Sequence, residues 1–160
     1  MIYIFLYVDD IIVTGNTPSA IQSLLHQLGT EFDIKDLGQL KYFLGLQIEY
    51  RSSGFFVHQH KYASDLLAKF NMSTCKPCFT PFVSLSRLHK DEGTPLQDPT
   101  PFRSMVGGLQ YLTFTQPDLS FAVNHICQFM HRPTYQHLIA AKRILSYVQG
   151  SLFNLARYNS

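Results

Sequence analysis

The sequence predicts an α+β fold in which antiparallel hairpins come first and a mostly helical region follows. Near the start, two runs of β-branched and aromatic residues flank a pair of acidic residues, a pattern typical of a strand hairpin. Residues 41–59 form a second pair of hydrophobic runs around the turn-forming triplet Ser52-Ser53-Gly54. Beyond residue 60, apolar residues recur at spacings of three and four, which indicates helices that share a core.

The first predicted hairpin joins residues 2–6 to residues 11–13 through a break at Asp9-Asp10. Two-residue hairpin loops favour Asn-Gly or Asp-Gly, because the loop backbone needs a positive φ. Two adjacent carboxylates fit that requirement poorly, and they also repel each other. A divalent cation at the tip would offset the repulsion. A charged turn exposed to water is the alternative that this pattern leaves open.

A helix is expected after the hairpin, since Thr17-Pro18 combines a helix-capping residue with proline at the first helical position. The apolar residues that follow predict a helix with one face on a sheet; they are Ile21, Leu24, Leu25, Leu28 and Phe32. Residues 41–50 and 55–59 are then expected to pair as strands. Residues 1–60 therefore form one predicted α+β unit.

The second half is predicted to be a helical bundle that contains a loop-rich segment, residues 71–101. One helix is expected to begin at Thr100-Pro101, and Gly150 is expected to end the last one. The other helices are predicted over residues 61–70, 118–130 and 134–148. Gly107 and Gly108 each destabilise their helix by about 1 kcal/mol, so close helix packing is expected to compensate.

Composition sets few limits on function. A formal net charge of +2 over 160 residues does not mark a nucleic-acid binder, so such a role must rest on local patches. Residues 1–8 are apolar but too few to span a bilayer, and we expect no membrane partner and no targeting segment. Cys75 and Cys78 have C-x-x-C spacing without a second pair. Ordinary loop thiols are therefore favoured over a zinc site, even with His58 and His60 as candidate ligands.

Several ordered blocks resemble one protein family. Tyr7-Val8-Asp9-Asp10 between two hydrophobic strands resembles the catalytic hairpin of reverse transcriptases, in particular those of copia-type long-terminal-repeat retrotransposons. The similarity continues in the same order through Ile34–Gly38, Tyr42–Ile48, Gln59–Ala63, Cys75–Pro77, Phe102–Gly107, Leu109–Thr113, Pro117-Asp118 and Ala140–Leu145. The chain is also similar to short open reading frames of this type in plant genomes, including mitochondrial ones.

The resemblance implies a segment of an RNA-directed DNA polymerase, with the C-terminal part of the palm in residues 1–60 and a helical thumb- or connection-like region in residues 61–160. Asp9 and Asp10 would then be catalytic residues that hold Mg²⁺ or Mn²⁺. The reaction would be two-metal nucleotidyl transfer from a deoxynucleoside triphosphate to an RNA or DNA template-primer. The family's third carboxylate and its fingers lie upstream, and its ribonuclease H region lies downstream. We therefore expect the isolated chain to hold the metal weakly and to be inactive alone.

Other residues take roles from the same resemblance. Tyr42-Phe43-Leu44-Gly45 resembles the primer grip, where a glycine lets a nucleic-acid backbone approach closely. Plain strand core with a bulge at Gly45 is the alternative. The candidate phosphate contacts are Lys35, Lys61, Arg103, Lys142 and Arg143, and solvated surface positions are the alternative for each.

Two departures from the family remove positive charge. Gln116 stands where the family usually has arginine before Pro117-Asp118, and Cys127-Gln128 replaces a usual Ser-Arg pair. The losses weaken the case for a nucleic-acid or salt-bridge role at these positions. A second hypothesis is favoured for the chain as it stands, because the family's upstream carboxylate is missing from it. In that hypothesis it is a degenerate transposon remnant without enzymatic activity and with at most weak nucleic-acid binding.

Overall fold

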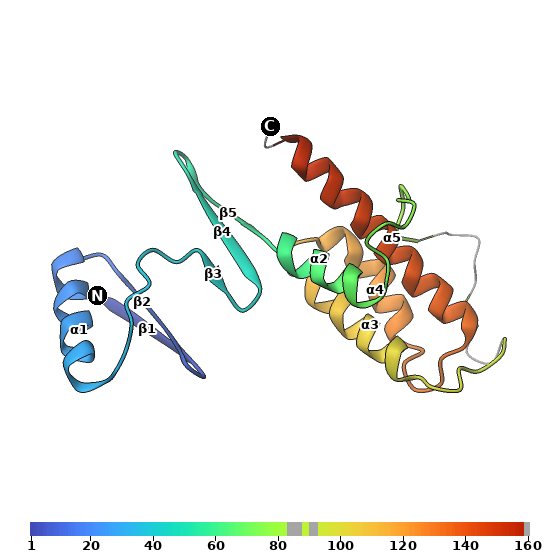
Figure 1. Ribbon diagram of the computed structural model, residues 1–160, viewed down its shortest axis with the longest axis horizontal. Coiled ribbons are helices and arrows are strands. Elements are labelled where there is room, and N and C mark those ends of the chain that lie inside the picture. Colours follow the sequence, from blue (N-terminus) through green and yellow to red (C-terminus); the bar gives the residue numbers. More distant parts are fainter. Residues whose placement is uncertain (83–87, 90–92, 159–160) are drawn as a thin grey trace. The chain divides into compact units, whose positions relative to one another are not determined.

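The structure is a computed structural model that describes residues 1–82, 88–89 and 93–158. It confirms the α+β class, with two small antiparallel sheets and a second half that is mostly helical (Figure 1). The chain divides into two compact units, Met1–Phe43 and Leu44–Ser160. The division into a palm part, residues 1–60, and a thumb-like part, residues 61–160, rests on the family resemblance and stays a prediction.

The first unit consists of a hairpin and one helix. Strand β1 (Ile2–Tyr7) pairs antiparallel with β2 (Asp10–Gly15), because both are runs of β-branched and aromatic residues. Helix α1 (Pro18–Glu31) begins after Thr17 with proline in its first turn, as predicted, although the Thr17 side chain makes no capping hydrogen bond. Helix α1 packs against β2. No residue of this unit is buried.

The second sheet has the strand order β3-β4-β5, formed by β3 (Tyr42–Phe43), β4 (Leu46–Arg51) and β5 (Gly54–His58). The predicted single strand over residues 41–50 is therefore wrong. Leu44 and Gly45 adopt left-handed backbone angles, with φ of 49° and 78°, and they turn the chain between β3 and β4.

The helices of the second unit are α2 (His60–Lys69), α3 (Thr100–Leu112), η1 (Pro117–Leu119), α4 (Ser120–Cys127) and α5 (Tyr135–Tyr158). They lie close to the predicted ranges, with two corrections. Thr100 is already helical, and its amide is capped instead by the Asp98 carboxylate at 2.9 Å. Helix α5 continues through Gly150, where a side chain would meet Cβ of Pro77 at 3.1 Å. This glycine serves packing and does not end the helix.

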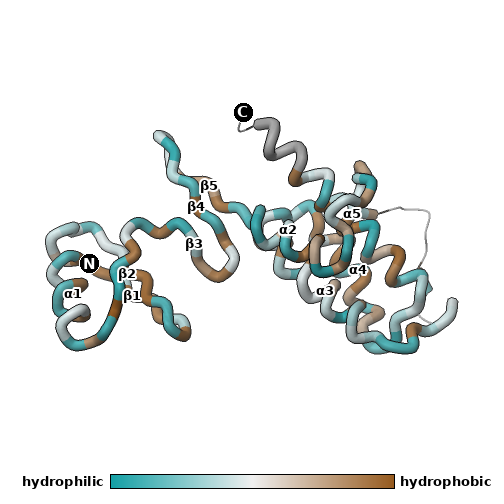
Figure 2. Tube along the Cα trace, viewed as in Figure 1, coloured by the Kyte–Doolittle hydropathy of each residue, from teal (hydrophilic) through white to brown (hydrophobic). Residues whose placement is uncertain are grey.

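The core lies between helices α2, α3, α4 and α5 (Figure 2). Its fully buried aliphatic and aromatic members confirm the apolar spacing that predicted α3 and α4; they include Phe102, Met105, Val106, Leu109, Leu112, Ala122, Val123 and Ile126. The close packing expected at the paired glycines occurs at Gly108, where an added Cβ would lie 2.4 Å from Leu66. Gly107 has nothing within 4 Å of that position, so nothing there compensates its helix penalty.

Candidate active site

The acidic pair lies at the tip of the β1-β2 hairpin. Tyr7 pairs with Asp10, so the two loop residues are Val8 and Asp9. The hairpin is confirmed, but the predicted break at Asp9-Asp10 is wrong by one residue, because Asp10 already belongs to β2. Val8 supplies the positive φ that the loop requires, at 51°. Left-handed geometry is strained for a β-branched residue, so the tip stores strain beside the carboxylates.

Both carboxylates are open to solvent. Asp9 and Asp10 are exposed, and Val8 between Tyr7 and Asp9 has 87 % of its surface exposed. Within the described residues, neither carboxylate takes part in a hydrogen bond or a salt bridge. Two neighbouring carboxylates that repel each other and lack a partner provide oxygen ligands of the kind Mg²⁺ prefers, with room for the waters that Mg²⁺ retains. Among the described residues, no third acidic, histidine or cysteine side chain completes a metal cluster.

Phe43 connects the primer-grip-like segment to the hairpin. Its ring packs edge-on against Tyr7, with 6.3 Å between centroids, and against Phe5 at 5.9 Å. Such edge-to-face aromatic pairs stabilise a contact beyond the area that they bury. The structure therefore brings the first half of Tyr42–Gly45 beside the strand that leads into Asp9.

The second half of that segment, Leu44-Gly45, sits on two tyrosines of the helical unit. The Tyr111 hydroxyl donates to the carbonyl oxygen of Leu44. A side chain at Gly45 would meet the Tyr111 ring at 3.3 Å and the Tyr62 ring at 3.7 Å. Gly45 is thus required by its positive φ and by this close approach. Both tyrosines lie in blocks that resemble the family, within Gln59–Ala63 and Leu109–Thr113, but the sequence did not predict their contact with Leu44-Gly45.

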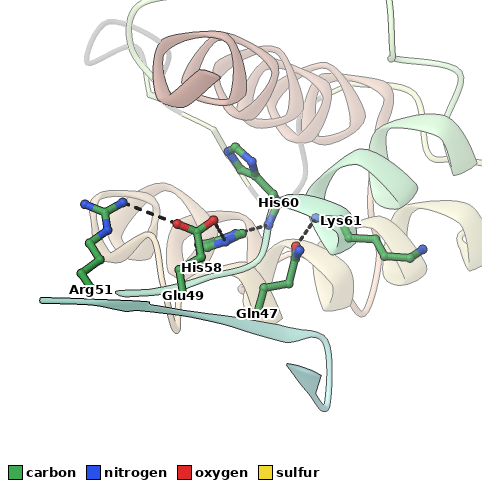
Figure 3. Close-up of polar contacts among 6 residues, drawn as sticks. All are labelled: Gln47, Glu49, Arg51, His58, His60 and Lys61. Atoms are coloured by element: carbon green, nitrogen blue, oxygen red, sulfur yellow. Dashed lines mark hydrogen bonds and ion pairs between the residues drawn. The ribbon is translucent and has the colours of Figure 1, made fainter. Parts of the chain in front are cut away.

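A cluster of polar side chains joins the β4-β5 hairpin to the start of α2 (Figure 3). The sequence did not predict the hydrogen bonds and ion pairs of this cluster. The Glu49 carboxylate accepts from Nε2 of His58 at 3.0 Å and pairs with Arg51 at 3.5 Å. Nδ1 of His58 accepts from the His60 amide at 3.3 Å. Burial, and then His58, lower the pKa of His60, while Glu49 raises it by a smaller amount. Gln47 caps α2 by accepting from the Lys61 amide at 2.8 Å.

The basic candidates fall into two groups. Three of them make contacts within the chain. Lys61 pairs with Asp65 at 2.8 Å, Arg103 donates through Nε to the backbone oxygen of Met130 at 2.9 Å, and Arg143 donates to a threonine hydroxyl at 3.0 Å. Lys35 and Lys142 are exposed. Lys61 and Arg103 are exposed as well, so the two groups differ in the side-chain contacts that Lys61, Arg103 and Arg143 make within the chain and not in exposure.

Comparison with known proteins identifies the class. Residues 1–84 match the reverse transcriptase (RNA-dependent DNA polymerase) family. The chain therefore belongs to that family, and the match includes the acidic hairpin and the primer-grip-like segment. No solved structure gives a significant match to the chain.

The relatives include copia-type Pol polyproteins and a mitochondrial protein. The chain is 47 % identical over 151 residues to the Retrovirus-related Pol polyprotein from transposon RE1 of Arabidopsis thaliana, covering 94 % of this chain and 10 % of the polyprotein. It is 46 % identical over 153 residues to an uncharacterized mitochondrial protein of the same plant, covering 95 % and 63 %. The Pol polyprotein from transposon TNT 1-94 of Nicotiana tabacum is 35 % identical over 161 residues, covering 94 % and 12 %. The chain thus spans about a tenth of the Pol polyproteins that it matches.

Over the part of the chain that the structure describes, none of the helices is both long enough and apolar enough to cross a membrane.

Proposed function

We propose that the chain is the palm-and-thumb segment of a copia-type reverse transcriptase and that Asp9 and Asp10 contribute to its two-metal site. The observation that carries the proposal is the hairpin tip, where two adjacent, exposed carboxylates lack any partner among the described residues. A turn that is only solvated would not be stabilised by a strained valine beside two like charges. A metal site would be favoured by a rigid tip that holds both carboxylates in place.

Asp9 and Asp10 would hold Mg²⁺ or Mn²⁺ together with waters and the phosphates of a deoxynucleoside triphosphate. When bound, the ions would stabilise the attacking and leaving oxygens of phosphoryl transfer. The chain's own contribution is to fix the two carboxylates: the β1-β2 ladder sets their position, and Tyr7 is buttressed by Phe43. We further propose that Tyr42–Gly45 positions the primer end, and that Lys35 and Lys142 contact phosphates.

The isolated chain is proposed to be inactive. Two carboxylates are too few to hold two metal ions tightly, and the described residues offer no third ligand beside them. Activity would require a further carboxylate from a longer polypeptide or from a second one.

An active copia-type reverse transcriptase provides the test. Its matching segment is replaced by this chain, and primer extension is measured with Mg²⁺. We expect extension by the chimera and its loss, by at least about 100-fold, on Asp9→Asn. Asp33→Asn is the matched control, since Asp33 is an exposed carboxylate of the same unit outside the hairpin. Equal activity of the two variants would refute the role of Asp9.

A further inference from the structure

The turn between β3 and β4 has a backbone conformation that its sequence alone does not favour. Leu44 has a φ of 49°, in the left-handed region that residues with a side chain rarely adopt, and Gly45 follows with a φ of 78°. Such a conformation persists only where the surrounding structure fixes it. The contacts that this turn makes within its own unit therefore determine its geometry.

Tyr111 of α3 makes two of these contacts. Its hydroxyl donates a hydrogen bond to the carbonyl oxygen of Leu44, which lies 67 positions earlier in the chain. Its ring lies 3.3 Å from the position that a Cβ at Gly45 would take. A carbonyl oxygen accepts hydrogen bonds within a preferred range of directions, so the hydroxyl orients the peptide group after Leu44. The ring limits how closely Gly45 can approach the helix.

Tyr62 of α2 supports the Tyr111 ring. The two rings meet edge to face with 5.0 Å between centroids, and the Tyr62 hydroxyl donates to the carbonyl oxygen of Gly108 at 3.4 Å. Burial, and then Tyr111, raise the pKa of Tyr62, so this hydroxyl stays protonated and remains a donor at neutral pH. Tyr111 is therefore held by α2 as well as by its own helix.

These contacts fix the turn through its backbone and leave its side chain free. The Leu44 side chain keeps 37 % of its surface exposed, and Gly45 has no side chain to block a close approach. A turn that only connected two strands would not need a partially exposed leucine in a left-handed conformation, held by a tyrosine from a distant helix. A rigid backbone with an accessible surface is what a segment that positions another molecule requires.

We propose that Tyr111, supported by Tyr62, is a positioning residue for the end of the primer. This inference rests on the proposed function, in which Tyr42–Gly45 positions the primer end. Tyr111 acts through Leu44-Gly45 and does not itself contact the reacting atoms. A displacement of about 1 Å at a reacting group can slow a reaction by about 100-fold. Loosening the turn would therefore slow nucleotide addition more than it would weaken binding of the nucleotide.

The chimeric reverse transcriptase that carries this chain tests the role. Tyr111→Phe removes the hydroxyl and keeps the ring, so packing against Gly45 and Tyr62 is retained. We expect kcat for single-nucleotide addition to fall by about tenfold, while KM for the deoxynucleoside triphosphate changes by less than about twofold. Tyr147→Phe is the matched control, because it also removes a hydroxyl that donates a hydrogen bond, to Asp118 at 2.7 Å. Its kcat should equal that of wild type.

Carbon-13 NMR of the full chain tests the contact without catalysis. The carbonyl carbon of Leu44 should shift upfield in Tyr111→Phe, because a carbonyl that loses its hydrogen-bond donor becomes more shielded. The same signal should be unchanged in Tyr147→Phe. An unchanged Leu44 signal in Tyr111→Phe would overturn the contact and the proposal together.

The kinetic outcomes separate this inference from the proposed function. Equal kcat values in Tyr111→Phe and Tyr147→Phe would overturn the positioning role while the chimera remains an active polymerase. A chimera that extends no primer with Tyr111 in place would refute the proposed function, and the positioning role with it. In that case the Leu44 carbonyl shift would still show whether Tyr111 holds the turn.

Discussion

The two compact units differ in what they bury and in what chemistry they carry. Leu44–Ser160 holds every buried hydrophobic residue of the described chain, whereas Met1–Phe43 buries none. The paired carboxylates lie in the unit without a core. Burial of apolar surface is the main stabilising term in folding, so stability should reside in the helical unit. The difference shows that the candidate site lies on the less stable part of the chain, where another polypeptide has most to contribute.

The largest effect should come from truncating a core aromatic residue. Phe102→Ala removes a fully buried ring from α3 and should lower the free energy of unfolding by about 3–5 kcal/mol. Phe32→Ala removes a ring that is 63 % exposed in the first unit and should change it by less than about 1 kcal/mol. Urea denaturation followed by circular dichroism measures both. Similar losses of unfolding free energy in the two variants would contradict the claim that stability resides in the helical unit.

The paired glycines of α3 sharpen the contrast within the helical unit. Gly108→Ala places a methyl group 2.4 Å from Leu66 and should destabilise by about 1–3 kcal/mol. Gly107→Ala enters open space and should stabilise by about 0.5–1 kcal/mol, because alanine favours the helix. The same urea experiment separates them. Shifts of the same sign would show that α3 packs differently.

In the first unit, we expect substitutions to change stability through backbone strain and not through packing. Val8→Asn replaces a β-branched residue at a positive φ with one that tolerates it, and should stabilise the hairpin by about 1 kcal/mol. Amide exchange in β1 and β2 should slow by about fivefold. Val13→Asn, at an extended position opposite Ile4, is the control and should accelerate exchange. Faster exchange in both variants would argue against strain at Val8.

The smallest effect concerns pH and the cluster around Glu49. The folded state holds the pKa of His60 below its ordinary value, so the unfolded state takes up the proton first as pH falls. The stability contributed by neutral His60 is therefore present above about pH 6.5 and is lost as pH drops below it. His60→Gln should flatten this dependence of the urea midpoint, and His26→Gln, at an exposed residue of α1, should leave it unchanged. The pKa of His137 is also lowered, mainly by burial, so part of the pH dependence of the urea midpoint should remain in His60→Gln.

Local patterns predicted much of the fold. The apolar spacing beyond residue 60 predicted α3, whose buried residues include Phe102, Met105 and Leu109, and the hydrophobic runs predicted the first hairpin. The errors occurred where backbone geometry or long-range packing decided. Positive φ at Leu44 broke a predicted strand, and packing against Pro77 kept Gly150 inside a helix.

For the candidate site, the sequence placed Asp9 and Asp10 at a hairpin, and their catalytic role stays a prediction; it did not predict the residues that support the neighbouring segment. Tyr111 contacts Leu44 across 67 positions, and only the tertiary fold brings them together. The loop itself was misplaced by one residue, because Val8 accepts a left-handed backbone that its residue type disfavours. No turn rule predicts such strain.

The central claim is that the metal-binding chemistry of this chain resides at the tip of the β1-β2 hairpin. Paramagnetic broadening by Mn²⁺ in amide NMR spectra of the full chain tests it most directly, because broadening falls off steeply with distance from the ion and needs no catalysis. We expect the amides of Val8, Asp9 and Asp10 to broaden first, and Asp9→Asn to remove the effect. Broadening that begins at Glu49 and His58, or that survives Asp9→Asn unchanged, would contradict the account.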